Sequence, residues 1–126
     1  MIRFFEKEDK SEIMKLAADF LGEKYDSEEF GIMFDEIVDG SPDERGISVL
    51  HAGEFLGYCC AHIQDEEVIV HQLYIKPQFQ KLKVATQVFD FIEAEFPDKK
   101  YRAIVPQDNE IANKVFAKRG YEIIAL

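Results

Sequence analysis

The sequence has little cysteine, no long hydrophobic run and no excess of basic residues, and each shortage excludes a class of protein. The only two cysteines among its 126 residues, Cys59 and Cys60, are adjacent. In an extended chain they would point to opposite faces, so neither a disulfide framework nor a metal site is indicated. No apolar stretch approaches the length of a bilayer span, and residues 1–6 lack the layout of a signal peptide. We therefore expect a soluble, cytoplasmic protein that does not associate with membranes.

The formal net charge is −10, and the charge is distributed unevenly along the chain. Residues 1–75 contain six Lys or Arg against 18 Asp or Glu, whereas residues 76–126 contain nine against seven. An acidic chain without a basic stripe interleaved with aromatic residues disfavours nucleic acid as a partner. The split is compatible with an anion bound by the C-terminal half and a cation attracted to the N-terminal half, while simple solubility explains an acidic surface equally well.

The apolar content predicts one packed domain. Hydrophobic residues make up 47% of the chain and include 11 phenylalanines, which makes disorder improbable on composition. A chain of this length is too short for two independent cores. We find no internal repeat and no Gly, Ser or Pro-rich linker, so residues 1–126 are interpreted as a single domain.

Hydrophobic periodicity changes twice along the chain. A period of 3.6 residues indicates helices and a period of two indicates strands. We expect Asp9 to cap the first helix, with Glu12 three residues later, and Ser27 to cap the second. The last helix is predicted to bury Ile111, Ala112, Val115 and Phe116. In chain order the predicted elements are strand 2–5, a helix ending before Gly22, a helix between Ser27 and Gly40, strands 47–51, 55–63 and 68–75, a helix from about 83 to 96, strand 101–105, a helix from Asp108 or Asn109 to Gly120, and strand 121–125.

This order, β-α-α-β-β-β-α-β-α-β, predicts an α/β fold with a mixed, mostly antiparallel sheet and helices on both faces. The connection between the strand ending at Ile75 and the strand starting at Tyr101 should be a right-handed parallel crossover. Its helix follows a strand closely, so its free N–H groups and positive dipole end would point into the loop 78–83. That arrangement is typical of a phosphate site.

Two segments carry a resemblance to a known family. Residues 73–85, Leu-Tyr-Ile-Lys-Pro-Gln-Phe-Gln-Lys-Leu-Lys-Val-Ala, are similar to a strand followed by a Gln/Arg-x-x-Gly-x-Gly/Ala loop over a pyrophosphate. Residues 109–121 are similar to an Asn-x-x-Ala, aromatic, Gly-aromatic pattern. Gly53 and Gly57 lie where family members often turn between strands two and three. In this order and spacing the chain resembles the GCN5-related N-acetyltransferase (GNAT) superfamily over essentially its whole length.

The resemblance implies a substrate pair and a binding site. Acetyl-CoA would be the co-substrate, bound at the V between strands four and five, with no metal, and the acceptor would be a cationic primary amine of a small molecule or peptide. In this family the first two helices commonly border the acceptor groove, so the acidic outer face of the second helix is a candidate for attracting that amine. The residues implied to contact the coenzyme are Leu73, Ile75, Gln80, Lys81, Lys83, Val84, Ala85, Thr86, Asn109 and Phe116.

The sequence departs from the family pattern at two positions. Lys83 stands at the first glycine of the loop, where its Cβ opposes close approach of the backbone to phosphate, although its ammonium group, like that of Lys81, is a candidate charge donor. Phe116 stands at the usual tyrosine and cannot protonate a departing thiolate. Tyr74 and Tyr121 are candidate replacements. A thiolate needs protonation less than an alkoxide does, so this loss predicts a handicap and not an abolition.

Direct attack of an amine on a thioester needs a base and an oxyanion site. An alkyl ammonium ion has a pKa near 10.4 in water, so a carboxylate or imidazole must accept its proton, directly or through water. His71 and Glu67 are the candidates, and each is also compatible with an ordinary strand or turn residue. Backbone N–H groups around 73–75 would stabilise the oxyanion. His51 and His62 are interpreted as plain strand residues. The alternative function is a non-catalytic regulatory or protein-binding module of the same fold, with weak or no CoA binding.

Overall fold

The computed structural model describes residues 1–126, except for the side chain of Lys81. Strands and helices follow the predicted order, with short 3₁₀ helices added between them. The strands are β1 (Ile2–Phe4), β2 (Glu44–His51), β3 (Glu54–Ile63), β4 (Glu67–Ile75), β5 (Lys100–Val105) and β6 (Glu122–Ala125). The helices are α1 (Lys10–Leu21), α2 (Ser27–Val38), α3 (Val84–Glu95) and α4 (Glu110–Arg119), and the 3₁₀ helices are η1 (Lys7–Asp9), η2 (Gly22–Lys24) and η3 (Pro77–Leu82).

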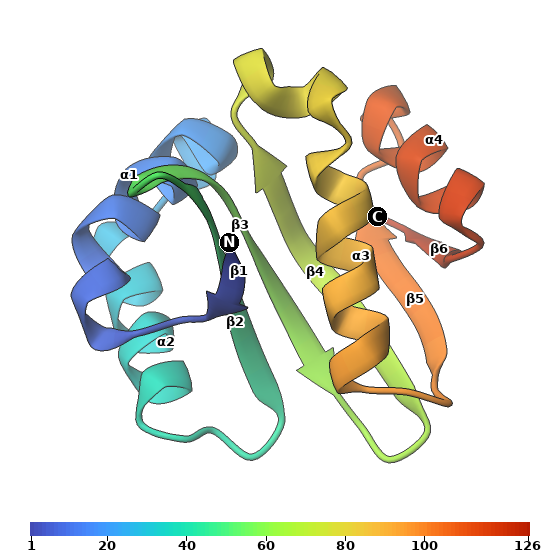
Figure 1. Ribbon diagram of the computed structural model, residues 1–126, viewed down its shortest axis with the longest axis horizontal. Coiled ribbons are helices and arrows are strands. Elements are labelled where there is room, and N and C mark those ends of the chain that lie inside the picture. Colours follow the sequence, from blue (N-terminus) through green and yellow to red (C-terminus); the bar gives the residue numbers. More distant parts are fainter.

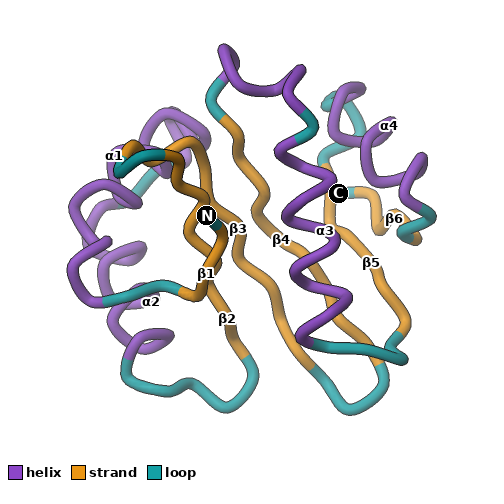
Figure 2. The backbone as a smooth tube through the Cα atoms, in the orientation of Figure 1, coloured by secondary structure: helices purple, strands orange, loops and turns teal.

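The strands form one sheet in the chain order β1 to β6 (Figures 1 and 2). Antiparallel ladders join β1 through β4, whereas β4 pairs in parallel with β5, and β5 in parallel with β6. Parallel neighbours require a crossover connection, and α3 and α4 supply the two that this sheet needs. The predicted α/β fold with a mixed, mostly antiparallel sheet is confirmed.

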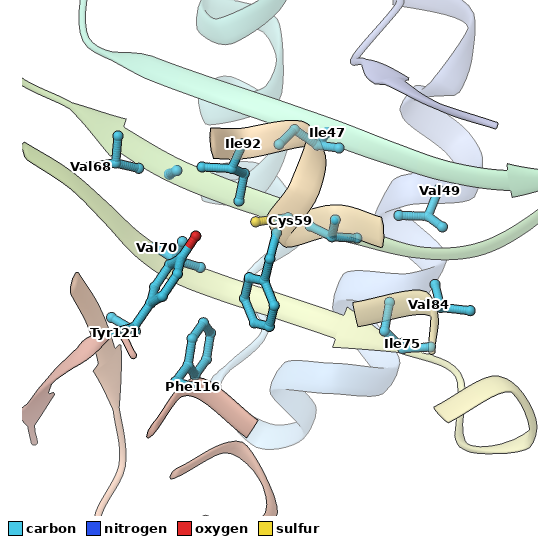
Figure 3. Close-up of a cluster of buried hydrophobic side chains, with 14 of the residues drawn as sticks. Ile47, Val49, Cys59, Val68, Val70, Ile75, Val84, Ile92, Phe116 and Tyr121 are labelled. Carbon is cyan, nitrogen blue, oxygen red and sulfur yellow. The ribbon is translucent and has the colours of Figure 1, made fainter. Parts of the chain in front are cut away.

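Each face of the sheet has its own core and its own helices. On one face Val70 of β4 packs with Ile92 of α3 and with Phe116 of α4. Figure 3 shows Phe116 and Tyr121 lying side by side and pointing toward β4 in this core. On the other face Tyr58 of β3 is completely buried with residues of α1 and α2. Alternate strand residues feed the two cores, as the period of two requires.

Asp9 does not cap α1, contrary to the prediction, since its carboxylate makes no capping hydrogen bond to that helix. It is buried, with 2% of its surface exposed. Its oxygens accept hydrogen bonds from the Arg3 guanidinium at 2.6 and 2.9 Å, from the Ser48 hydroxyl at 2.8 Å and from the Glu6 N–H at 3.0 Å. Burial opposes ionisation, but these donors outweigh it and lower the pKa of Asp9 below its ordinary value.

Two further local predictions are corrected, and one open alternative is resolved. Asp26 caps α2 in place of Ser27, because its carboxylate accepts from the Glu29 N–H at 3.0 Å. Of the two candidates for α4, Asn109 is the cap. Ile111, in the first turn of α4, is 68% exposed and not buried as predicted.

The turn between β2 and β3 consists of Ala52 and Gly53, both with positive φ, which matches a type I′ hairpin turn. Gly57 lies inside β3, as the predicted strand 55–63 has it, so the resemblance to a family turn holds for Gly53 and not for Gly57. The predicted loop 78–83 folds as η3, which begins at Pro77. Among the described residues, no helix is long and apolar enough to cross a bilayer.

Candidate active site

A cleft opens where β4 and β5 separate. Their parallel pairing runs from Glu67 opposite Lys100 to Val70 opposite Ala103 and then stops, although both strands continue. The next residue on β4, His71, has no partner on β3 because the register shifts there. Such a bulge bends its strand. Figure 2 shows β4 and β5 diverging toward the end that carries η3, so the predicted V exists and begins at His71.

The separated part of β4 directs backbone groups into this opening. The Lys76 N–H donates to the Leu56 carbonyl of β3 at 2.8 Å. Because alternate residues of a strand direct their N–H and C=O groups to the same side, the groups of Ile75 and Leu73 point away from β3. The Ile75 carbonyl accepts a hydrogen bond from the Gln80 side chain at 3.0 Å on that side. Two main-chain N–H groups, those of Leu73 and Ile75, therefore face the cleft.

Gly57 fixes how closely β3 approaches this segment of β4. It pairs with Ile75, and a Cβ added at Gly57 would lie 2.2 Å from the Tyr74 carbonyl oxygen. No side chain fits at that distance without moving the backbone of β4. The glycine therefore serves close strand packing beneath the cleft.

The cleft consists of three adjoining cavities: the outer one lies between η3, α3 and α4, and the other two lie between β4 and α4. The outer cavity, of about 410 Å³, shares Gln80, Ala85 and Val115 with the central cavity, of about 270 Å³. The central cavity in turn adjoins the far cavity, of about 220 Å³. The lining residues common to these two are Phe20, Leu73, Asn109, Ala112 and Phe116. The three cavities thus lie next to one another from the start of α3 to His71, which lines the far cavity.

The outer cavity lies at the N-terminus of α3. No side chain caps this helix, so the N–H groups of Val84, Ala85 and Thr86 have no partner within it. Lys83 precedes them with φ 59° and ψ 25°, a left-handed conformation that glycine adopts without cost. The loop therefore keeps the backbone geometry of a glycine turn while it carries a lysine. Ala85, Thr86 and Lys83 line the cavity, whereas the Val84 side chain is buried in the core.

Cationic side chains surround this cavity. Lys83, Lys118 and Arg119 line it. Hydrogen bonds from Arg119 to Glu93 at 3.0 Å and to Asp90 at 2.6 Å hold the guanidinium against α3 and raise its pKa above the ordinary arginine value. The two lysines are thus the cations that remain for an anion. The predicted contact by Lys81 lies outside the described side chains.

The central cavity is mostly apolar. Phe116, which stands where the sequence resemblance implied a tyrosine, lines it. This ring is buried, with 4% of the residue exposed, and its centroid lies 5.4 Å from that of the Phe89 ring. Asn109 also lines the cavity, but its side-chain oxygen accepts from the Ala112 N–H at 3.1 Å and so caps α4. The side chains of Leu73 and Ile75 complete the β4 wall.

The two candidate tyrosines differ in access to the cleft. Tyr74 lines the central cavity beside Phe20, with ring centroids 5.4 Å apart. Burial, and secondarily the charge of Asp19, raises the pKa of Tyr74, so its hydroxyl keeps its proton near neutral pH. Tyr121 is buried, donates to a Glu93 oxygen at 3.0 Å and lines none of the three cavities. Tyr74 is therefore the hydroxyl donor that the structure brings to the cleft.

The two candidate bases, His71 and Glu67, also differ in access to the cleft. His71 lines the far cavity, and its Nε2 lies 2.9 Å from an oxygen of Glu44. Glu67 lies at the opposite end of the paired segment, where its carboxylate accepts from Arg102 at 3.1 Å, and it lines none of the three cavities. His62, which we expected to be a plain strand residue, also contacts Glu44, at 2.7 Å through Nδ1.

The charged lining of the far cavity differs from the expectation. The acidic side chains of α2 line none of the three cavities, whereas Lys24 of η2 lines the far one. The acidic residues of α2 therefore do not form a wall of the cleft. No group of described His, Cys, Asp and Glu side chains has the arrangement of a metal site.

Comparison with known proteins identifies the family. The model of the acetyltransferase (GNAT) family matches residues 10–121. The chain therefore belongs to the GNAT acetyltransferase family, and the resemblance in the sequence is confirmed. No curated protein sequence matches this chain significantly.

Solved structures share the fold at low sequence identity. Aminoglycoside N-acetyltransferase AAC(6')-Iy in complex with CoA aligns with a TM-score of 0.84 at 16% identity, covering 97% of this chain and 87% of that chain. A possible acetyltransferase from Clostridium difficile 630 aligns with a TM-score of 0.81 at 12% identity, covering 97% and 90%. PaiA N-acetyltransferase from Thermoplasma acidophilum, in complex with coenzyme A, aligns with a TM-score of 0.77 at 16% identity, covering 95% and 87%. These similarities establish the shared fold.

Proposed function

We propose that this protein is an acetyl-CoA-dependent N-acetyltransferase that acts on a primary amine of a small molecule or peptide. The observation that carries the proposal is the row of adjoining cavities along the opened sheet, from the N-terminus of α3 to His71. Similarity to acetyltransferases solved with coenzyme A supports it.

The residues of the outer and central cavities fit a coenzyme A thioester. The N–H groups of Val84, Ala85 and Thr86 and the positive end of α3 would bind the pyrophosphate. Lys83 and Lys118 add cationic charge at the same cavity. The apolar walls of the central cavity suit the pantetheine arm, and the coenzyme would supply the acetyl group as an activated thioester.

Groups at the central and far cavities would serve the transfer. The acceptor nitrogen attacks the thioester carbonyl carbon, so a C–N bond forms while the C–S bond breaks. His71 accepts the proton that the amine loses, and Tyr74 donates a proton to the departing sulfur. The N–H groups of Leu73 and Ile75 would stabilise the developing oxyanion from the β4 edge.

A second function is favoured by one specific observation. Phe116 offers no hydroxyl at the position where many family members have one, and its ring is packed into the core. A protein of this kind that binds the coenzyme without turnover would be a regulatory or protein-binding module. Binding and turnover must therefore be measured separately.

Calorimetric titration with acetyl-CoA, followed by a free-thiol assay with a panel of amines, tests the proposal. We expect binding and turnover in the unaltered protein and a loss of binding of at least tenfold in Ala85→Glu, which places a carboxylate among the phosphate donors. Ala94→Glu makes the same change at the exposed far end of α3 and should bind normally. Absence of heat at millimolar acetyl-CoA would contradict the proposal, and binding without turnover would favour the module.

A further inference from the structure

A carboxylate connects two imidazoles across three strands of the sheet. Glu44, the first residue of β2, places one oxygen 2.7 Å from Nδ1 of His62 on β3 and the other 2.9 Å from Nε2 of His71 on β4. About a quarter of each side chain is exposed: 27% of Glu44, 29% of His62 and 25% of His71. The contact therefore sits at the border between the sheet and solvent, beside the far cavity.

The geometry fixes which ring nitrogens carry protons. An ionised carboxylate accepts hydrogen bonds and donates none, so each imidazole nitrogen that faces Glu44 must be the protonated one. In neutral His71 this leaves the lone pair on Nδ1. Because His71 occupies the bulge and lines the far cavity, its ring is held at the point where the cleft begins.

Two other charged side chains belong to β4 or to the far cavity. Glu67, the carboxylate on β4 itself, is held by Arg102, and Lys24 lines the far cavity together with His71. Glu44 is thus the acidic partner of His71, and His62 occupies its second oxygen. Two anchored oxygens leave the carboxylate one orientation, where a single contact would leave it free to rotate.

We infer that Glu44 is a positioning residue for the transfer: it orients His71 and fixes its tautomer so that Nδ1 accepts the proton of the acceptor amine, while His62 holds Glu44 in place. This inference rests on the proposed function and adds to it a residue that does not touch either substrate. A carboxylate in this role also stabilises the imidazolium ion that forms when His71 takes the proton.

The test compares two acceptors of equal length, n-butylamine and O-propylhydroxylamine, with saturating acetyl-CoA. The first amine is protonated at neutral pH and needs a base, whereas the second is weakly basic and already neutral. We expect Glu44→Ala to lower kcat about 30-fold with n-butylamine and less than about threefold with O-propylhydroxylamine, with the KM for acetyl-CoA within about twofold of the unaltered protein. His62→Gln, which keeps an N–H donor to Glu44, should retain about a third or more of kcat.

Two controls separate positioning from folding. Glu122→Ala removes an exposed carboxylate of β6 that pairs with Lys100 and Arg102, and it should change neither acceptor's rate. Proton NMR should show downfield imidazole N–H resonances for His62 and His71 that disappear in Glu44→Ala. A merely structural role predicts equal losses with both acceptors.

The outcomes distinguish this inference from the function on which it rests. Equal rate losses with the two acceptors, or an unchanged kcat in Glu44→Ala while the unaltered protein is active, would overturn the positioning role alone. An unaltered protein that turns over no amine at all would overturn the proposed function and the positioning role together.

Discussion

The antiparallel half of the sheet, β1 to β4, and the parallel half, β4 to β6, differ in how their backbone groups are paired. From β1 to β4 the strands are joined by antiparallel ladders, and the ion pair between buried Asp9 and half-buried Arg3 holds the first strand against η1. From β4 to β6 the strands are parallel, and the first ladder of this half ends after Val70. In the first, closed half each strand pairs with its neighbours, whereas the second, open half leaves backbone donors of β4 unpaired at a cleft. Stability and ligand binding should therefore respond to substitutions in different halves.

The largest stability effect is expected in the closed half. Asp9→Asn removes a buried charge that accepts from Arg3, Ser48 and the Glu6 N–H, and we expect a loss of about 3 kcal/mol in the free energy of unfolding. Asp35→Asn, which breaks the exposed pair with Lys10, should cost less than about 1 kcal/mol. Urea denaturation measures both, and equal effects would contradict the comparison.

The pH dependence of stability follows from the same carboxylate. Because the pKa of Asp9 is lower in the folded than in the unfolded chain, its contribution is fully present above the unfolded value of about 3.9 and is lost as the pH falls through the folded value. Urea midpoints between pH 6 and pH 3 should fall less steeply in Asp9→Asn than in the unaltered protein. Parallel profiles would show that Asp9 contributes no such term.

Gly57 lies at the border between the halves. Gly57→Val places a side chain against the Tyr74 carbonyl and should cost about 2 kcal/mol in stability, since β4 must move. It should also weaken acetyl-CoA binding, because the N–H groups of Leu73 and Ile75 move with the strand. Calorimetry on the folded variant checks this, and normal binding would show that the β4 edge does not contact the thioester.

A smaller effect, of opposite sign, is expected in the open half. Lys83→Gly relieves a left-handed backbone and should stabilise the fold by up to about 1 kcal/mol, while the loss of its ammonium group from the outer cavity should weaken acetyl-CoA binding modestly. Asp98→Gly relieves the same conformation, φ 60°, outside the cleft and should change stability alone. A large loss of binding in Lys83→Gly alone would show that the ammonium contacts the phosphates.

The smallest effect concerns the acceptor. Lys24 is the formally charged side chain in the described lining of the far cavity, and it should repel acceptors with several cationic groups. Lys24→Gln should lower the KM for spermidine about twofold and leave that for n-butylamine unchanged. Equal KM changes for the two amines would exclude an electrostatic role for Lys24.

The fold was predictable because it depends on local patterns, and parts of the site were not because they depend on distant contacts. Periodicity and turn residues placed every strand and helix, and the loop motif indicated the N-terminus of α3. The position of Glu44, 27 residues before His71, follows from strand register across β3, which periodicity does not specify. The prediction that Asp9 caps α1 was wrong for a related reason: its carboxylate accepts a hydrogen bond from Ser48, 39 residues away.

Titration of ¹⁵N-labelled protein with acetyl-CoA tests the central claim most directly, because amide resonances report each half of the sheet separately. We predict that the amides of Leu73, Ile75 and Val84 to Thr86 shift in proportion to the ligand bound, while those of β1 and β2 stay unchanged. Unchanged amides at the β4 edge and at the start of α3, or shifts confined to the closed half, would contradict the assignment of the opened strands as the binding site.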